Sequence, residues 1–224
     1  MTAPAASLAT AIGHLATDGF AVIPDYFDGQ LCQALKAEAC ALDRDPAAID
    51  AGIGRHSAHA TDPAIRHARI RWLDAATEAQ QQFLGAAETL RLNLNQRLFL
   101  GLFSFEAQLA LTPPGGFYAR HLDSFRGARN RIVSLVAYLS EDWQAADGGC
   151  LRIWPPSGVS PADPQPEIAP APEATPPIDV EPQRGTLVLM LSEVVPHAVL
   201  PAHRARPSVA GWFRVNSQNP ISKH

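Results

Sequence analysis

The sequence predicts an α+β protein in which helices support a β-sandwich or jelly roll on one face. Segments with apolar residues at helical spacing are concentrated in the first hundred residues. Residues 101–216 instead show short alternating or apolar runs that are separated by glycine and proline. Helices followed by a series of strands are typical of an α+β fold rather than of alternating α/β units.

The first hundred residues are predicted to be mostly helical. Residues 5–17 form a short helix, and residues 20–27 contain an apolar, strand-like run. Asp28 is a good N-cap for a second helix, because its carboxylate can accept a hydrogen bond from a free backbone N–H. Residues 45–69 are punctuated by proline and glycine and are predicted to be a loop with a strand at its end. Residues 75–97 are the longest helix candidate.

The second half is predicted to contain the strands FEAQLALT, RIVSLVAYLS, GGCLRIW, TLVLMLS and SVAGWFRV. Residues 155–182 hold ten of the twenty prolines, and proline cannot donate to a sheet ladder. This segment is therefore predicted to be a loop inserted between two strands. We expect one domain over residues 1–224, with helical support in 1–100 and the strand-rich core in 101–216.

The composition narrows the class of protein. The chain has 224 residues, 46% hydrophobic and 18% charged, which is typical of a globular domain. A net charge of −4 gives no electrostatic case for binding nucleic acid. No stretch has the apolar length that spans a bilayer, the N-terminus does not look like a signal peptide, and the three cysteines form no framework. We expect a cytoplasmic protein that binds neither nucleic acid nor membrane.

A candidate metal site begins with His121 and Asp123. In an extended strand, residues i and i+2 point to the same face, so the imidazole and the carboxylate project side by side. His197 lies just past the end of another predicted strand. Two imidazoles and one carboxylate form the facial triad of non-haem Fe(II) oxygenases, although three such ligands alone could also hold Zn(II) and a water.

Arg206 favours iron over zinc. Period two places Arg206 and Trp212 on one strand face, and an arginine on an inner face is costly unless a carboxylate meets it. No acidic residue recurs nearby in the sequence. A dicarboxylate cosubstrate would chelate the metal through its 2-oxo acid end and bind the guanidinium through its far carboxylate. Tyr138 could donate a further hydrogen bond to that carboxylate.

The sequence resembles the Fe(II)/2-oxoglutarate dioxygenases, within them the prolyl 4-hydroxylase-like branch that includes the hypoxia-sensing prolyl hydroxylases and their bacterial relatives. The matching segments, spread in order over residues 105–214, are YARHLDSF, AYLSEDW, GGCLRIW, PHAVLPAHRAR and GWFR. The resemblance implies a double-stranded β-helix (jelly roll) whose N-terminal helices pack on one sheet. It implies Fe(II) and 2-oxoglutarate as cofactors, O2 as co-reactant and ascorbate as an accessory.

The resemblance also implies a role for each matching residue. The implied iron ligands are His121, Asp123 and His197. The positions implied to bind or line the cosubstrate pocket are Arg206, Tyr138, Leu151 and Trp212.

Two features concern the surroundings of the site. Members related to the hypoxia sensors carry a tyrosine ten residues before the first iron ligand, where this chain has Leu111. A hydrogen bond near the metal-binding end of the cosubstrate is therefore predicted to be missing or replaced. Residues 52–71 match, in position, the lid that relatives close over a peptide.

The resemblance implies hydroxylation of a C–H bond, with release of succinate and CO2. The expected substrate is a prolyl residue in a protein, and the bacterial relatives suggest a component of the translation machinery. One alternative is a hydroxylase of a free amino acid or another small molecule. The other is a sensor that binds metal and 2-oxoglutarate without turnover.

Overall fold

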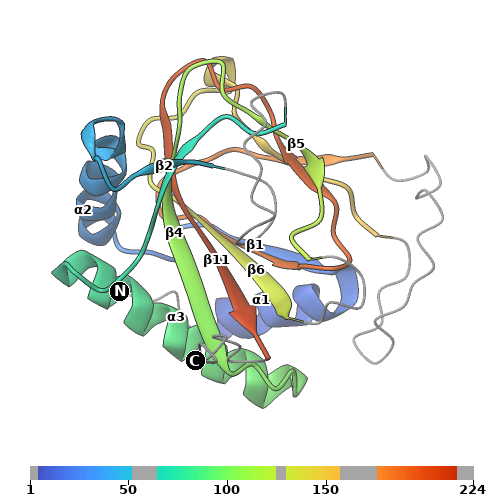
Figure 1. Ribbon diagram of the computed structural model, residues 1–224. Coiled ribbons are helices and arrows are strands. Elements are labelled where there is room, and N and C mark those ends of the chain that lie inside the picture. The colour runs from blue at the N-terminus through green and yellow to red at the C-terminus, as the bar shows by residue number, and fades with distance from the viewer. Residues whose placement is uncertain (1–4, 52–64, 125–129, 157–175, 216–224) are drawn as a thin grey trace, which may run out of the picture.

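The computed structural model describes residues 5–51, 65–124, 130–156 and 176–215, which are built around two antiparallel β-sheets (Figure 1). The larger sheet contains, in spatial order, β1 (Phe20–Ile23), β9 (Leu187–Leu191), β6 (Arg131–Tyr138), β11 (Arg206–Arg214), β4 (Ser104–Thr112), β3 (Arg69–Trp72) and β2 (Ile49–Asp50). The smaller sheet contains β5 (Tyr118–His121), β10 (His197–Val199), β7 (Leu151–Ile153) and β8 (Ile178–Val180). The predicted α+β jelly roll is confirmed.

Three helices lie on one side of the larger sheet (Figure 1): α1 (Ala5–Asp18), α2 (Gly29–Cys40) and α3 (Glu78–Leu98). Short 3-10 turns occupy Leu42–Arg44 and Ala145–Asp147. The N-cap predicted at Asp28 is confirmed, because its carboxylate accepts a hydrogen bond of 2.8 Å from the backbone N–H of Gln30.

The outward face of the larger sheet forms the main core with the helices. Strand register places Leu109 of β4 opposite Val209 of β11, and both are buried in the same cluster as Phe83 of α3. The ring of Phe105 lies 4.6 Å from that of Phe213, measured between centroids. Side chains on a strand alternate between faces, so the residues between these apolar positions must point the other way.

The inward face of the larger sheet is the polar one. Its buried polar residues include Gln108 and Thr112 on β4, Tyr138 on β6, and Arg206 and Ser208 on β11. Below them, a second and smaller apolar cluster fills part of the space between the two sheets. The sequence thus gives one sheet a face that stabilises the fold and a face that offers polar groups to the interior.

Two loop predictions need correction or lie outside the described residues. The predicted loop 45–69 contains the two-residue strand β2, and the predicted insertion 155–182 contains β8. β8 occupies a proline-free stretch and is tied to β7 by Arg152, whose Nη2 lies 2.7 Å from the Asp179 carboxylate. The proline-rich residues 157–175, and residues 52–64 of the predicted lid, lie outside the described part of the chain.

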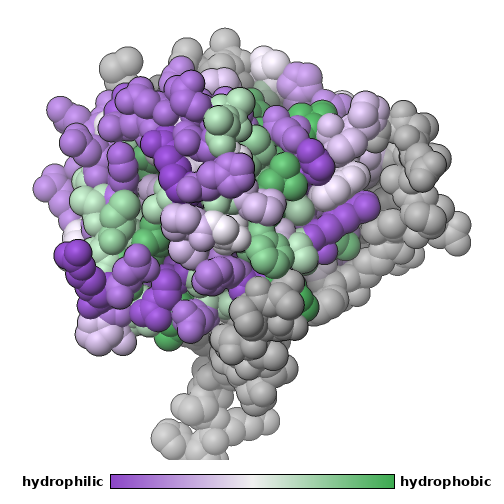
Figure 2. All heavy atoms as spheres, turned by 90° about the horizontal axis from the view of Figure 1, so that it is seen from above, coloured by the Kyte–Doolittle hydropathy of each residue, from purple (hydrophilic) through white to green (hydrophobic). Residues whose placement is uncertain are grey.

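The visible surface mixes polar and apolar residues. Seen from above, hydrophobic residues appear as small groups separated by hydrophilic ones (Figure 2). Among the helices of the described residues, none is long and apolar enough to cross a membrane.

Candidate metal centre

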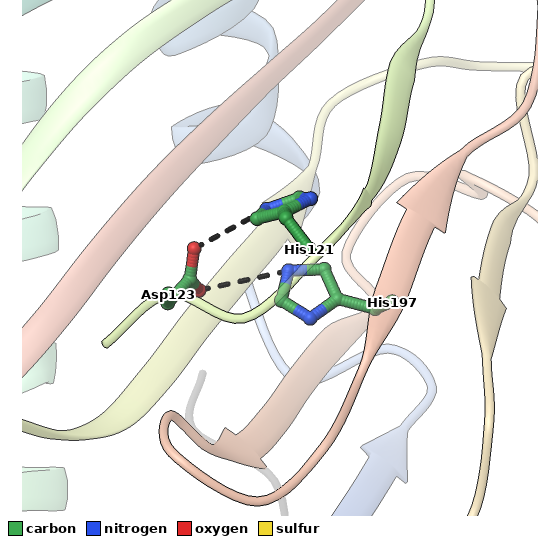
Figure 3. A group of neighbouring side chains, drawn as sticks. All are labelled: His121, Asp123 and His197. Atoms are coloured by element: carbon green, nitrogen blue, oxygen red, sulfur yellow. Dashed lines mark ion pairs between the residues drawn. The ribbon is translucent and has the colours of Figure 1, made fainter. Parts of the chain in front are cut away.

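The structure brings His121, Asp123 and His197 together on the inner side of the smaller sheet (Figure 3). His121 ends β5 and His197 begins β10, and the two residues are direct partners in the antiparallel pairing of these strands. Asp123 follows β5 by two residues. Each of the three offers a ligand atom, and these atoms all lie within 4.8 Å of one another.

The three polar atoms face a common point. Nε2 of His121 lies 3.4 Å from one carboxylate oxygen of Asp123, and Nε2 of His197 lies 3.6 Å from the other. The two imidazole rings are 4.3 Å apart between centroids. The side chains of Asp123 and His197 are only 11% and 6% exposed. Such a group, converging from two strands, is a ligand set rather than a surface ion pair.

Backbone hydrogen bonds fix the orientation of both imidazoles. Nδ1 of His121 lies 2.8 Å from the carbonyl oxygen of Ala119, and Nδ1 of His197 lies 3.1 Å from that of Val195. An Nδ1–H that donates to a carbonyl leaves the lone pair on Nε2. Both rings therefore present an Nε2 lone pair to the common point, where it can bind a metal.

The site keeps its carboxylate ionised and its buried imidazole neutral. Burial alone would raise the pKa of Asp123, but His197, His121 and the Ser134 hydroxyl outweigh it and hold this pKa well below its usual range. Burial lowers the pKa of His197 below 6.5, although Asp123 opposes the shift. An ionised carboxylate beside a neutral imidazole is the protonation state that binds a metal.

Sequence reasoning missed an aromatic and cationic layer behind His121. The ring of Tyr118 stacks on the His121 imidazole at 3.5 Å, and the guanidinium of Arg66 lies 4.7 Å from the Tyr118 ring centroid. A β-bridge joins Arg66 to Tyr118. Tyr118 precedes His121 by three residues and could have been noticed. Arg66 lies far away in the sequence, so only the fold reveals it.

Arg206 and Tyr138 form a second polar group on the inward face. Arg206 is 3% exposed, and among the described residues its Nε and Nη2 have no hydrogen-bond partner. The Tyr138 hydroxyl is likewise buried without a partner, and the guanidinium lies 4.9 Å from its ring centroid. Burial raises the pKa of Tyr138 to about 12, so the phenol stays protonated as a hydrogen-bond donor.

Unpaired buried donors of this kind fit an anionic ligand. An arginine remains charged even when burial lowers its pKa, and leaving it unpaired is costly. A carboxylate would accept the guanidinium and phenol hydrogen bonds together. The donor set therefore fits the far carboxylate of 2-oxoglutarate, while the histidines and the aspartate fit Fe(II).

The other two predicted pocket residues lie on either side of this space. Leu151 on β7 is buried in the same apolar cluster as Tyr138. Trp212 on β11 is 6% exposed, and its ring lies beneath the Arg131 guanidinium at 3.7 Å.

The prediction that Leu111 lies beside the metal-binding end of the cosubstrate is wrong. Leu111 is buried in the core with the helices, on the outward face of β4. The inward position is the next residue, Thr112, which pairs directly with Arg206 across the strands. Counting back from His121 crosses the turn after β4, so a turn that differs in length by one residue shifts the selected position by one. Neighbouring residues on a strand point to opposite faces, so this shift moves the selected residue from the inward to the outward face.

Fold and ligand set together define a jelly roll that holds a facial triad of possible metal ligands and, on its inward face, a buried arginine and tyrosine. A family profile described as the 2OG-Fe(II) oxygenase superfamily matches residues 107–214. The solved structure of a Pseudomonas putida prolyl-4-hydroxylase is 41% identical, with a TM-score of 0.77, and the match covers 93% of this chain and 99% of that one. The chain belongs to the 2OG-Fe(II) oxygenase superfamily, which uses Fe(II) and 2-oxoglutarate.

More distant relatives also match this chain in sequence or in fold. Human Egl nine homolog 1 is 25% identical over 205 residues, or 87% of this chain and 43% of that protein. The hypoxia-inducible factor prolyl hydroxylase of Caenorhabditis elegans is 29% identical over 115 residues, or 50% of this chain. This chain spans only 14% to 43% of the length of these two relatives. A Trichoplax adhaerens prolyl hydroxylase, solved with a hypoxia-inducible factor peptide fragment, shares the fold at a TM-score of 0.76 and 20% identity.

Proposed function

We propose that the protein is a 2-oxoglutarate-dependent dioxygenase that hydroxylates a prolyl residue in a protein or peptide. The observation that carries this proposal is the convergence of His121, Asp123 and His197 between the two sheets, where Arg206 is also buried with no partner for its Nε and Nη2 among the described residues. The similarity to the Pseudomonas putida prolyl-4-hydroxylase supports the prolyl substrate.

Each residue of the site has a distinct task in this reaction. When Fe(II) and 2-oxoglutarate are bound, they supply the oxidation: one oxygen atom of O2 enters succinate and the other enters the C–H bond of the substrate, with loss of CO2. His121, Asp123 and His197 would hold the metal through two imidazole nitrogens and one carboxylate. Arg206 and Tyr138 hold the far carboxylate of the cosubstrate and so fix its orientation.

Burial serves the same purpose. The apolar cluster of Leu151, Val188 and Met190 lies beside Tyr138 between the sheets. It excludes water from the space that the cosubstrate would occupy, which strengthens the ionic contact with Arg206.

The test is a reaction of the purified chain with Fe(II), 2-oxoglutarate, O2 and proline-containing peptides. We expect a one-oxygen mass gain on a prolyl residue, with equimolar succinate. Oxidation of free proline without oxidation of any peptide would favour a small-molecule hydroxylase. Binding of 2-oxoglutarate without any succinate, even in uncoupled turnover, would favour a sensor and contradict the proposal.

Three finer expectations stay predictions: a substrate from the translation machinery, a cytoplasmic location and a requirement for ascorbate. The first two are tested by mass spectrometry of ribosomal and translation-factor prolyl residues in cells with and without the gene. The third is tested by turnover with and without ascorbate.

A further inference from the structure

Further polar atoms on the inward face of the larger sheet are buried and have no hydrogen-bond partner among the described residues. They include Nε2 of Gln108 on β4 and Nε1 of Trp212 on β11. Buried polar groups without a partner are uncommon in folded proteins, and leaving one unpaired destabilises the fold. Arg206 and Tyr138 share this property, and the proposed function gives them a ligand. It gives none to Gln108.

The position of Gln108 on β4 directs its side chain toward the space between the two sheets. The residue is 1% exposed and pairs with Ala210 on one side and Trp72 on the other. Its neighbour Leu109 points into the core with the helices, so the Gln108 amide must point inward. Among the described residues, no group accepts a hydrogen bond from its Nε2.

Strand register places Trp212 at the end of β11 that lies nearer to the metal ligands. Trp212 pairs with Ser134 on β6, and Ser134 is one of the groups that hold the pKa of Asp123 low. Arg206 lies six residues before Trp212 on the same strand face. Gln108, opposite Ala210, lies between the two ends but nearer to Trp212.

Burial indicates which ligand reaches these donors. Trp72, which lies 6.1 Å from Trp212 between ring centroids, is 43% exposed and so reaches the surface. Gln108 and Trp212 are only 1% and 6% exposed, and the Arg131 guanidinium lies over the Trp212 ring. A small dianion can be enclosed together with both buried donors, whereas a peptide main chain would meet the exposed Trp72 first.

We propose that Gln108 and Trp212 donate hydrogen bonds to the metal-binding carboxylate of 2-oxoglutarate. This inference rests on the proposed function and deepens it. Arg206 and Tyr138 hold one end of the cosubstrate, and the Gln108 amide and the Trp212 indole hold the other. Hydrogen bonds to a charged oxygen are about twice as strong as neutral ones. Binding of the carboxylate would therefore offset the free-energy cost of burying both donors.

The test compares two buried glutamines. Gln108→Met keeps the approximate volume of the side chain but removes the donor. In the matched control, Gln80→Met, the glutamine is 3% exposed and its Nε2 donates to Glu38 at 2.7 Å within the helical layer. The Kd for 2-oxoglutarate is measured by anaerobic calorimetry on Mn(II)-loaded protein. We expect Gln108→Met to raise this Kd about 10-fold or more, and Gln80→Met to leave it unchanged.

Stability provides a second readout. In the absence of ligand, Gln108→Met should keep or raise the Tm, because an unsatisfied amide is removed, whereas Gln80→Met should lower it. An unchanged Kd in Gln108→Met, or a loss confined to peptide binding, overturns the inference and leaves the proposed function standing. A wild-type protein that does not bind 2-oxoglutarate contradicts the proposed function itself.

Discussion

The two faces of the larger sheet differ in what their buried side chains contact. On β4, Leu109 and Leu111 point into the core with the helices. The neighbouring residues Gln108 and Thr112 face the other way, toward the smaller sheet. The outward face has apolar partners for its side chains. The inward face holds donors that no described residue satisfies. One face therefore stabilises the fold, and the other is complete only when a ligand is bound.

The comparison predicts that mutations on the two faces have separable effects. Outward substitutions should lower the free energy of unfolding and leave ligand affinity unchanged. Inward substitutions should weaken ligand binding and leave the free energy of unfolding unchanged or higher.

The largest expected effect is on the metal site. His197→Ala removes a ligand that is 5% exposed and oriented by the Val195 carbonyl. Metal affinity should fall by more than the roughly 10–100-fold that loss of an outer partner costs, and turnover should be lost. Anaerobic calorimetry with Fe(II) measures the affinity. The control is His203→Ala, because the His203 side chain is exposed and, among the described residues, hydrogen-bonds to the Ala146 carbonyl. Wild-type metal affinity in His197→Ala would remove the triad.

A large effect on stability is expected from Leu109→Ala. This side chain is 1% exposed in the core with the helices. Its truncation should cost about 2–5 kcal/mol of unfolding free energy, because a cavity replaces a packed side chain. Urea denaturation measures this loss, and calorimetry on the folded variant should give the wild-type Kd for 2-oxoglutarate. A weakened Kd at temperatures where the variant is folded would show that the faces are coupled.

The opposite behaviour is expected from Arg206→Met. Loss of a charge-assisted contact worth about 1.5–3 kcal/mol should weaken 2-oxoglutarate binding about 10–100-fold. Metal affinity should stay unchanged. The ligand-free variant should be as stable as the wild type or more stable, because a buried unpaired charge is removed. A marked drop in Tm together with an unchanged Kd would assign Arg206 to the structure instead.

The smallest expected effect is a pH dependence of the metal-free protein. Burial lowers the pKa of His197 in the folded state, whereas an unfolded histidine titrates near 6.5. The unfolded chain then binds a proton that the folded chain does not, so unfolding free energy should fall as pH drops below about 6.5. One proton gives at most about 1.4 kcal/mol per pH unit.

The variant His197→Gln should flatten this slope. An unchanged slope in His197→Gln would mean that another group titrates.

Strand alternation explains why much of the site could be predicted from sequence. His121 ends β5, Asp123 follows it by two residues, and His197 begins β10. Arg206 begins the nine-residue strand β11, which pairs with β4 in regular register throughout. Placing the helices required only apolar spacing and a cap such as Asp28.

Register is what the sequence did not reveal. Counting back from His121 selected Leu111, whereas the pairing with Arg206 selects Thr112. Gln108 seemed an ordinary polar residue in an alternating strand until its burial and its missing partner were visible. Arg66 reaches the site through a bridge to Tyr118 between distant segments, which no local pattern encodes.

The most direct test of the central claim is an anaerobic titration of the Fe(II)-loaded protein with 2-oxoglutarate. A chelated 2-oxo acid on a facial-triad iron gives a visible metal-to-ligand charge-transfer band. We predict a band that saturates in the wild type, disappears in His197→Ala and requires far more 2-oxoglutarate in Arg206→Met. Absence of the band, together with tight Zn(II) binding at the same residues, would contradict the account and indicate zinc chemistry.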